Sequence, residues 1–181
     1  MEKGVLENNI EKPSVLYHGS INPDLEELEP RALSWRDKDE GPRIFATPDR
    51  RLATIFAGKN EMVVGSGTFN NTPYARILGT ADEFIASDKG GYLYTLPTDS
   101  FECDPGKGLG TSEWTCKVNV KPHTKEHFDS ALDAMLAEGV QVFFMDNSTH
   151  EAIQNSKDHG YSILKSMQSE NQKRGVNVVD F

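Results

Sequence analysis

The chain has 181 residues with a mean hydropathy of −0.56, and 36% of them are hydrophobic. This is enough chain to bury the core of one globular domain, and no apolar run approaches the roughly 18 residues that a membrane helix needs. The formal net charge of −9 argues against a general nucleic-acid binder, because such proteins neutralise phosphates with clustered Lys and Arg. A local basic site around Arg43, Arg50 and Arg51 stays open.

The first 13 residues are polar and predict an N-terminal arm that ends at Pro13. They lack the basic and apolar blocks of a secretory signal, so we expect a cytoplasmic protein, with export by a signal-independent route left open. Cys103 and Cys116 lack the paired spacing of a zinc site and are expected to be free thiols.

Residues 14–57 predict two strands and one helix. Residues 14–18 read as a strand, and residues 22–42 as a long loop rich in charges and prolines. A short strand at 43–46 leads into a helix at 48–57. Thr47 is the expected N-cap of that helix, with Pro48 at its first position.

The rest of the chain predicts more strands than helices. Further strands are expected at 62–64, 75–78, 92–96, 113–120 and 140–145, and helices at 125–138 and 148–159. A loop rich in Gly, Asn and Thr is expected between the strand at 62–64 and Pro73. The glycine-rich stretch 104–112 is not a phosphate loop, because no Gly-Lys-Ser/Thr triplet precedes a helix there. Short strands with few strand–helix–strand crossovers predict a single α+β domain over residues 14–181.

Polar side chains at the strand ends are the candidates for chemistry. His18 and Ser20 can supply hydrogen bonds, while Gly19 lets a ligand approach the main chain, although the same triplet also makes an ordinary turn. Glu113 reads either as a catalytic carboxylate or as a solvated strand-edge one. His123, His127 and His150 lack a supporting Cys or second pair, so no metal site is expected. His18, Ser20 and Cys103 form no recognisable nucleophile–base set.

Three segments also form a recognisable series. His18-Gly19-Ser20 closes the first strand, the strand 43–46 enters the helix 48–57, and Ser112-Glu113-Trp114 opens a late strand. In this order and spacing they resemble the ADP-ribosyltransferase superfamily, in its diphtheria-toxin and poly(ADP-ribose) polymerase branch. The resemblance spans residues 15–120. It implies a split, largely antiparallel sheet core with a few flanking helices and an NAD cleft between the two sheet halves.

The resemblance also implies a role for each matched residue. Gly19 would bond the nicotinamide amide, His18 the adenosine ribose, and Ser20 would help to seat the dinucleotide. Glu113 would hold the nicotinamide ribose and stabilise positive charge at its anomeric carbon, as a preorganised carboxylate can. Phe56 or Phe45 would stack on the nicotinamide ring. His18 and Glu113 are therefore the expected catalytic residues.

The chain departs from the family where the family places tyrosines. Ile44 stands on the strand, and an ungapped match puts Ile55 at the stacking position of the helix. Phe56 takes that position only if the helix is shifted by one residue, and both phenylalanines also fit a plain core role.

The function implied by the resemblance is transfer of ADP-ribose from NAD to an unidentified acceptor (a protein, a nucleic acid or a small molecule), with release of nicotinamide. Two alternatives use the same fold. One is a catalytically silent NAD-binding or regulatory module, which Ile44 and Ile55 favour. The other is an NAD-dependent RNA 2′-phosphotransferase, which the acidic charge disfavours. An unrelated α+β protein with coincidental motifs is the third alternative.

Overall fold

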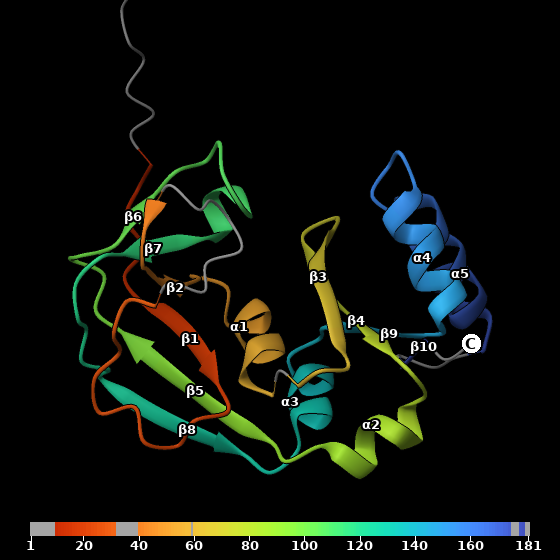
Figure 1. Ribbon diagram of the computed structural model, residues 1–181, viewed down its shortest axis with the longest axis horizontal. Helices are drawn as coiled ribbons and strands as arrows, with labels where there is room; N and C mark the ends of the chain where they lie inside the picture. The colour runs from red at the N-terminus through yellow and green to blue at the C-terminus, as the bar shows by residue number, and fades with distance from the viewer. Residues whose placement is uncertain (1–9, 32–39, 59, 175–177, 180–181) are drawn as a thin grey trace, which may run out of the picture.

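The computed structural model describes residues 10–31, 40–58, 60–174 and 178–179 (Figure 1). These residues form an α+β fold with three small sheets and five α-helices, so the predicted fold class is confirmed at this level. Residues 1–9 of the predicted arm and 32–39 of the predicted loop lie outside the described part. None of the described helices is long and apolar enough to cross a membrane.

The strands fall into three sheets. The first is antiparallel, in the order β1 (Leu16–Ser20), β5 (Gly91–Leu96) and β8 (Thr124–Phe128). The second is also antiparallel, in the order β2 (Ile44–Ala46), β7 (Trp114–Cys116) and β6 (Glu102–Cys103). The third is mixed, in the order β10 (Val178–Val179), β9 (Gln141–Met145), β4 (Thr72–Leu78) and β3 (Val63–Phe69).

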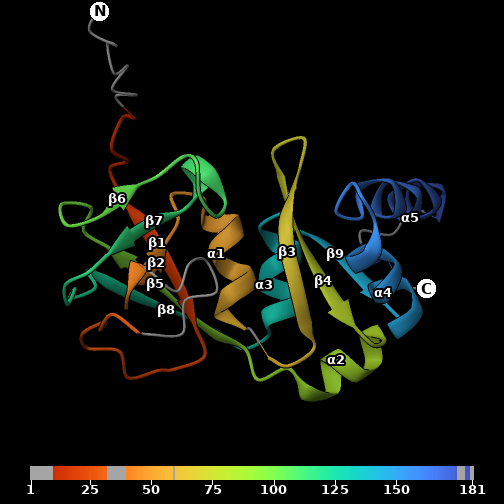
Figure 2. The same ribbon diagram turned by 45° about the horizontal axis from the view of Figure 1, so that its top comes forward.

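Helices cover both faces of the third sheet. The helices are α1 (Arg50–Ala57), α2 (Ala81–Ser87), α3 (Ala131–Ala137), α4 (Asn147–Asn155) and α5 (Tyr161–Arg174). Figures 1 and 2 show α1 and α3 between the first and third sheets, with α4 and α5 beyond the third sheet. The helix α1 therefore touches both β1 and β4 and links the two halves of the molecule.

The core is divided in the same way. One apolar cluster joins the first two sheets and includes Leu16, Ile44 and Trp114. A second fills the space between the third sheet and the helices α1, α2 and α3. A third lies on the opposite face of the third sheet, under α4 and α5. The side chains of α1 supply Leu52 and Ile55 to the second cluster.

Glycines allow α1 to lie close to the first sheet. A Cβ on Gly19 of β1 would overlap main-chain atoms of Ala53 and Ala57, and a Cβ on Gly91 of β5 would overlap the main chain of Ala57. Larger residues would push the helix outward. The glycine of the His-Gly-Ser triplet is thus also required by helix packing.

The predicted cap of α1 is wrong by two residues. Asp49 is the N-cap, and its carboxylate accepts a hydrogen bond from the Arg51 N–H at 2.9 Å. Thr47 instead exchanges two main-chain hydrogen bonds with Tyr17 of β1, at 2.8 and 3.0 Å. That bridge joins the first and second sheets, so Thr47 belongs to the sheet and the helix begins after Pro48.

The predicted helix at 125–138 is wrong in its first half. Residues 124–128 form β8, which pairs with β5 so that Lys125 lies opposite Tyr94 and His127 opposite Tyr92. The helix α3 begins only after Ser130, whose hydroxyl accepts from the Asp133 N–H at 3.0 Å. Asp88 reinforces this start by accepting from the N–H groups of Ala131 and Leu132, each at 3.0 Å.

Other boundaries also move. The predicted strand 113–120 is reduced to β7, and α4 ends at Asn155 and not near 159. The sequence analysis did not anticipate α2, α5, β6 or β10. It also placed a loop where β3 turns tightly into β4 through Asn70 and Asn71, which both have positive φ.

Candidate functional site

A cavity of about 570 Å³ opens where β1 and β2 separate, and α1 forms its floor. The strand β3 and residues 108–113 supply the remaining walls. Five of the six predicted site residues line it: His18, Gly19, Phe45, Phe56 and Glu113. The other lining residues are Tyr17, Ala46, Thr47, Leu52, Ala53, Ser66, Gly108, Leu109 and Ser112.

The opening arises from an interrupted strand ladder. The main-chain N–H and C=O of Tyr17 bond to Thr47, the residue that follows β2, and so point away from β5. Because main-chain direction repeats every two residues in a strand, the N–H and C=O of Gly19 also point away from β5. In a continuous ladder Gly19 would pair with Phe45. Instead the Nδ1 atom of His18 lies 2.7 Å from the Phe45 carbonyl oxygen. The imidazole thus takes the place of a main-chain partner, and the Gly19 N–H and C=O face the cavity.

The bond to Phe45 fixes the tautomer of His18. A carbonyl oxygen can only accept, so Nδ1 carries the proton and a neutral ring offers Nε2 as an acceptor. Burial lowers the pKa of His18 below 6.5, and the charge of Arg31 lowers it further, while the bond to Phe45 opposes both. The ring is therefore neutral at pH 7, and Nε2 can accept a hydrogen bond from a ligand hydroxyl.

The structure places both candidate phenylalanines at the cavity and both isoleucines in the core. Phe45 and Phe56 line the cavity, whereas Ile44 and Ile55 are only 3% and 1% exposed. On α1, the residues Leu52, Ala53 and Phe56 share the face toward the cavity, as helical spacing predicts. Position 55 therefore turns into the second apolar cluster, whereas Phe56 both lines the cavity and packs against that cluster.

Glu113 occupies the junction between a turn and a strand. It ends a short 3₁₀ helix (Gly110–Ser112), with its N–H bonded to the Gly110 carbonyl at 3.1 Å. The next residue, Trp114, pairs with Ala46 of β2, which anchors this end of the turn. The main chain of Glu113 is thus anchored at the cavity wall by β7 on one side, and the glycine-rich segment adjoins it on the other.

Ser20 is not brought to the cavity. Its hydroxyl accepts a hydrogen bond from the Asn22 N–H at 3.1 Å, which closes the turn after β1. The sequence left open that the triplet makes an ordinary turn, and for Ser20 this interpretation is correct.

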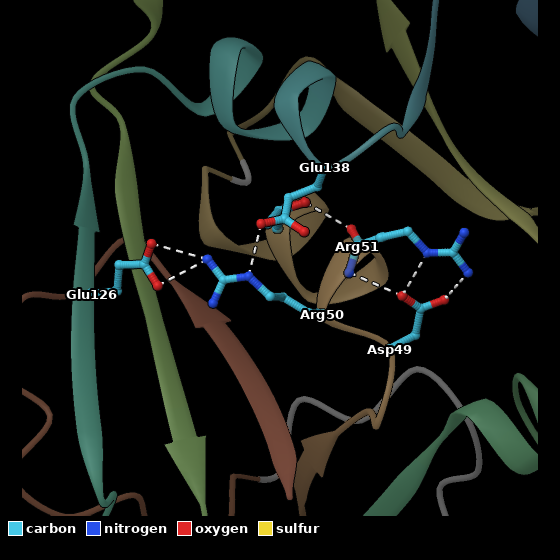
Figure 3. Close-up of polar contacts among 6 residues, drawn as sticks. Asp49, Arg50, Arg51, Glu126 and Glu138 are labelled. Carbon is cyan, nitrogen blue, oxygen red and sulfur yellow. Dashed lines mark hydrogen bonds and ion pairs between the residues drawn. The ribbon is translucent and has the colours of Figure 1, made fainter.

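The basic residues that could have formed a local anion site face carboxylates, as Figure 3 shows for Arg50 and Arg51. Arg50 contacts Glu138 at 2.7 Å and Glu126 at 2.9 Å. Arg51 contacts Asp49 at 2.8 Å, and the Nε atom of Arg43 lies 3.3 Å from Glu40. No Lys or Arg is among the described residues that line the cavity. Arg50 bridges β8 and the end of α3, which is a structural role.

Several cavity residues were not predicted from the sequence. Ser66 comes from β3, in a stretch that was expected to be a loop. Leu52 and Ala53 have the helical spacing of buried residues, and both also border the cavity. Within the described residues, no group of three or more His, Cys, Asp and Glu side chains could hold a metal ion.

Comparison of this chain with known protein families, curated proteins and solved structures finds no match.

Proposed function

We propose that this chain is an NAD-dependent ADP-ribosyltransferase, which transfers ADP-ribose from NAD to an acceptor and releases nicotinamide. The observation that carries the proposal is the convergence of His18, Gly19, Phe45, Phe56 and Glu113 on one cavity, from four separate segments. The proposal includes the fold: the two antiparallel sheets that part at this cavity would be the split sheet of the superfamily.

Main-chain geometry supports a carboxamide ligand. The amide of nicotinamide carries an N–H₂ donor and a carbonyl acceptor, and so needs one acceptor and one donor. The Gly19 C=O and N–H offer that pair at the interruption between β1 and β2. Phe45 and Phe56 line the cavity, and a phenylalanine ring could stack on the nicotinamide ring, since stacking needs no phenol hydroxyl.

The neutral ring of His18 supports ribose binding. Its Nε2 atom can accept a hydrogen bond from a ribose hydroxyl, while Nδ1 remains fixed on Phe45. Two hydrogen-bonding groups, one from β1 and one from the β7 junction, would thus hold the two ribose units of the dinucleotide.

Glu113 would promote the reaction electrostatically. The bond between the anomeric carbon and the nicotinamide nitrogen breaks, and its electron pair neutralises the positively charged pyridinium. Positive charge then develops on the ribose carbon, and the carboxylate of Glu113 stabilises it through the neighbouring 2′-hydroxyl. The acceptor nucleophile bonds to that carbon and gives up its proton.

Mass spectrometry of the purified protein incubated with NAD tests the proposal. We expect free nicotinamide together with ADP-ribose or an ADP-ribosylated product. Glu113→Gln should lower the rate at least about a hundredfold, in the range seen when one transition-state contact is removed. Glu151→Gln, an exposed carboxylate on α4, is the matched control and should leave the rate unchanged.

Calorimetry with NAD separates the alternatives. Binding without nicotinamide release would identify the silent module. Neither binding nor release would overturn the proposal altogether. Unchanged turnover by Glu113→Gln would remove the role given to that residue.

A further inference from the structure

The strand β3 forms one border of the third sheet and also borders the cavity. It pairs with β4 on one side and is last in the strand order, so no described strand adjoins its other edge. Ser66, in the middle of β3, lines the cavity that also contains Glu113. The free edge of β3 is therefore next to the proposed site of chemistry.

The hairpin register identifies which main-chain groups lie on this edge. Phe69 and Thr72 flank a two-residue turn, so they form a hydrogen-bonded pair, and bonded pairs then recur at every second residue. Ser66 and Thr68 fall between the bonded pairs and point their N–H and C=O groups away from β4. Proline at position 73, opposite Thr68, agrees with this assignment because it has no N–H to donate.

The edge lacks the usual protection against strand addition. Exposed edges normally carry charged residues, prolines or bulges. Val63–Phe69 contains no charged residue and no proline. Its single register shift lies between Val63 and Gly65, before the outward-facing residues Ser66 and Thr68. The tip of the hairpin is held in place, because the Nη2 atom of Arg51 donates to the Asn71 carbonyl at 3.0 Å. The same guanidinium is fixed on Asp49, to which Nη2 donates at 2.8 Å and Nε at 3.0 Å (Figure 3).

We propose that the open edge of β3 binds the acceptor as an extended polypeptide strand, so that the acceptor is a protein. The transfer of ADP-ribose to the bound strand rests on the proposed function, whereas the binding of a polypeptide to β3 does not. The outward N–H and C=O groups of Ser66 and Thr68 repeat every two residues, about 7 Å apart, which matches the repeat of main-chain donors and acceptors in an extended polypeptide. A strand added beside Ser66 would present a nucleophilic side chain to the cavity wall formed by Glu113.

Selection from a random-peptide library displayed on phage supplies a probe without knowledge of the natural acceptor. Enriched peptides are labelled with a fluorophore, and their binding is measured by anisotropy. Thr68→Pro removes one outward N–H but no bond between β3 and β4, and Thr68 does not line the cavity. The matched control, Thr68→Val, keeps that N–H. We expect Thr68→Val to bind as the wild type does and Thr68→Pro to bind about tenfold more weakly.

Hydrogen exchange on the wild-type protein tests the same point without a variant. The amides of Ser66 and Thr68 should slow on peptide binding, whereas Gly67, already bonded to β4, should not. The inference is overturned if no peptide is enriched, if Thr68→Pro binds as tightly as the wild type, or if a single-stranded RNA oligomer protects these amides in place of a peptide. Nicotinamide release by the wild type, measured without any peptide, tests the proposed function separately.

Discussion

Replacing Gly19 by alanine tests how α1 is held against β1. A Cβ at this position would overlap main-chain atoms of Ala53 and Ala57. These atoms belong to the helix backbone and cannot rotate away as the end of a flexible side chain could. Either α1 or β1 must therefore move, and with it the cavity that lies between them.

The magnitude follows from two opposing effects. Overpacking of a well-filled interior costs about 1–3 kcal/mol. The reduced freedom of alanine in the unfolded chain returns about 0.4–1 kcal/mol. The net loss is about 1–2 kcal/mol, which lowers the Tm of a chain of this size by about 2–8 °C.

Urea and thermal unfolding followed by circular dichroism measure this loss. Gly106→Ala is the matched control, because Gly106 lies in an exposed loop where the nearest atom is a side-chain oxygen of Asp104 at 3.3 Å. We expect the control to be at least as stable as the wild type, with a gain of up to about 1 kcal/mol from the reduced freedom of alanine in the unfolded chain. A Gly19→Ala protein as stable as the wild type would refute the requirement for close approach between α1 and β1.

Two further predictions concern pH and helix capping. The pKa of His18 is lowered in the folded state, so below about pH 6.5 the unfolded chain binds a proton that the folded chain does not. The free energy of unfolding therefore decreases as the pH is lowered, by at most about 1.4 kcal/mol per pH unit. Urea unfolding at pH 7.5 and 5.5 should show a larger loss for the wild type than for His18→Gln; equal losses would contradict the burial of a neutral ring. Asp88→Ala should cost about 0.5–2 kcal/mol, because two N–H groups at the start of α3 lose their acceptor. The fully exposed Asp129 carboxylate provides the control Asp129→Ala, and equal stabilities of the two variants would argue against the cap.

Local signals in the sequence were sufficient for β1, α1 and β7, three of the elements around the cavity. The run from Val15 to His18 has the composition of a strand, and β1 overlaps it. The helix α1 was also predicted, because apolar residues at helical spacing lie between a capping segment and Gly58. The alternation of apolar and polar residues after Glu113 indicated β7 but overstated its length.

Non-local pairing explains what the sequence analysis missed. Residues 124–128 have few strand formers, and they become β8 because β5 offers a neighbouring edge. Phe128 lies at helical spacing from Leu132, which concealed the break at Ser130. At the cavity, the position of Phe56 depends on the rotation of α1 against two sheets, which no local pattern specifies. Ser20 could not be excluded from the cavity until its bond to Asn22 was known.

The bond between His18 and Phe45 means that the two sheets are held apart before any ligand arrives. A ligand that bonds the Gly19 main chain therefore does not have to separate neighbouring strands. None of its binding free energy is then consumed in opening the fold, and no minor open state has to be populated first. The imidazole thus keeps β1 and β2 apart at this point. Substituting it should allow Gly19 and Phe45 to form the main-chain hydrogen bonds of a continuous antiparallel ladder.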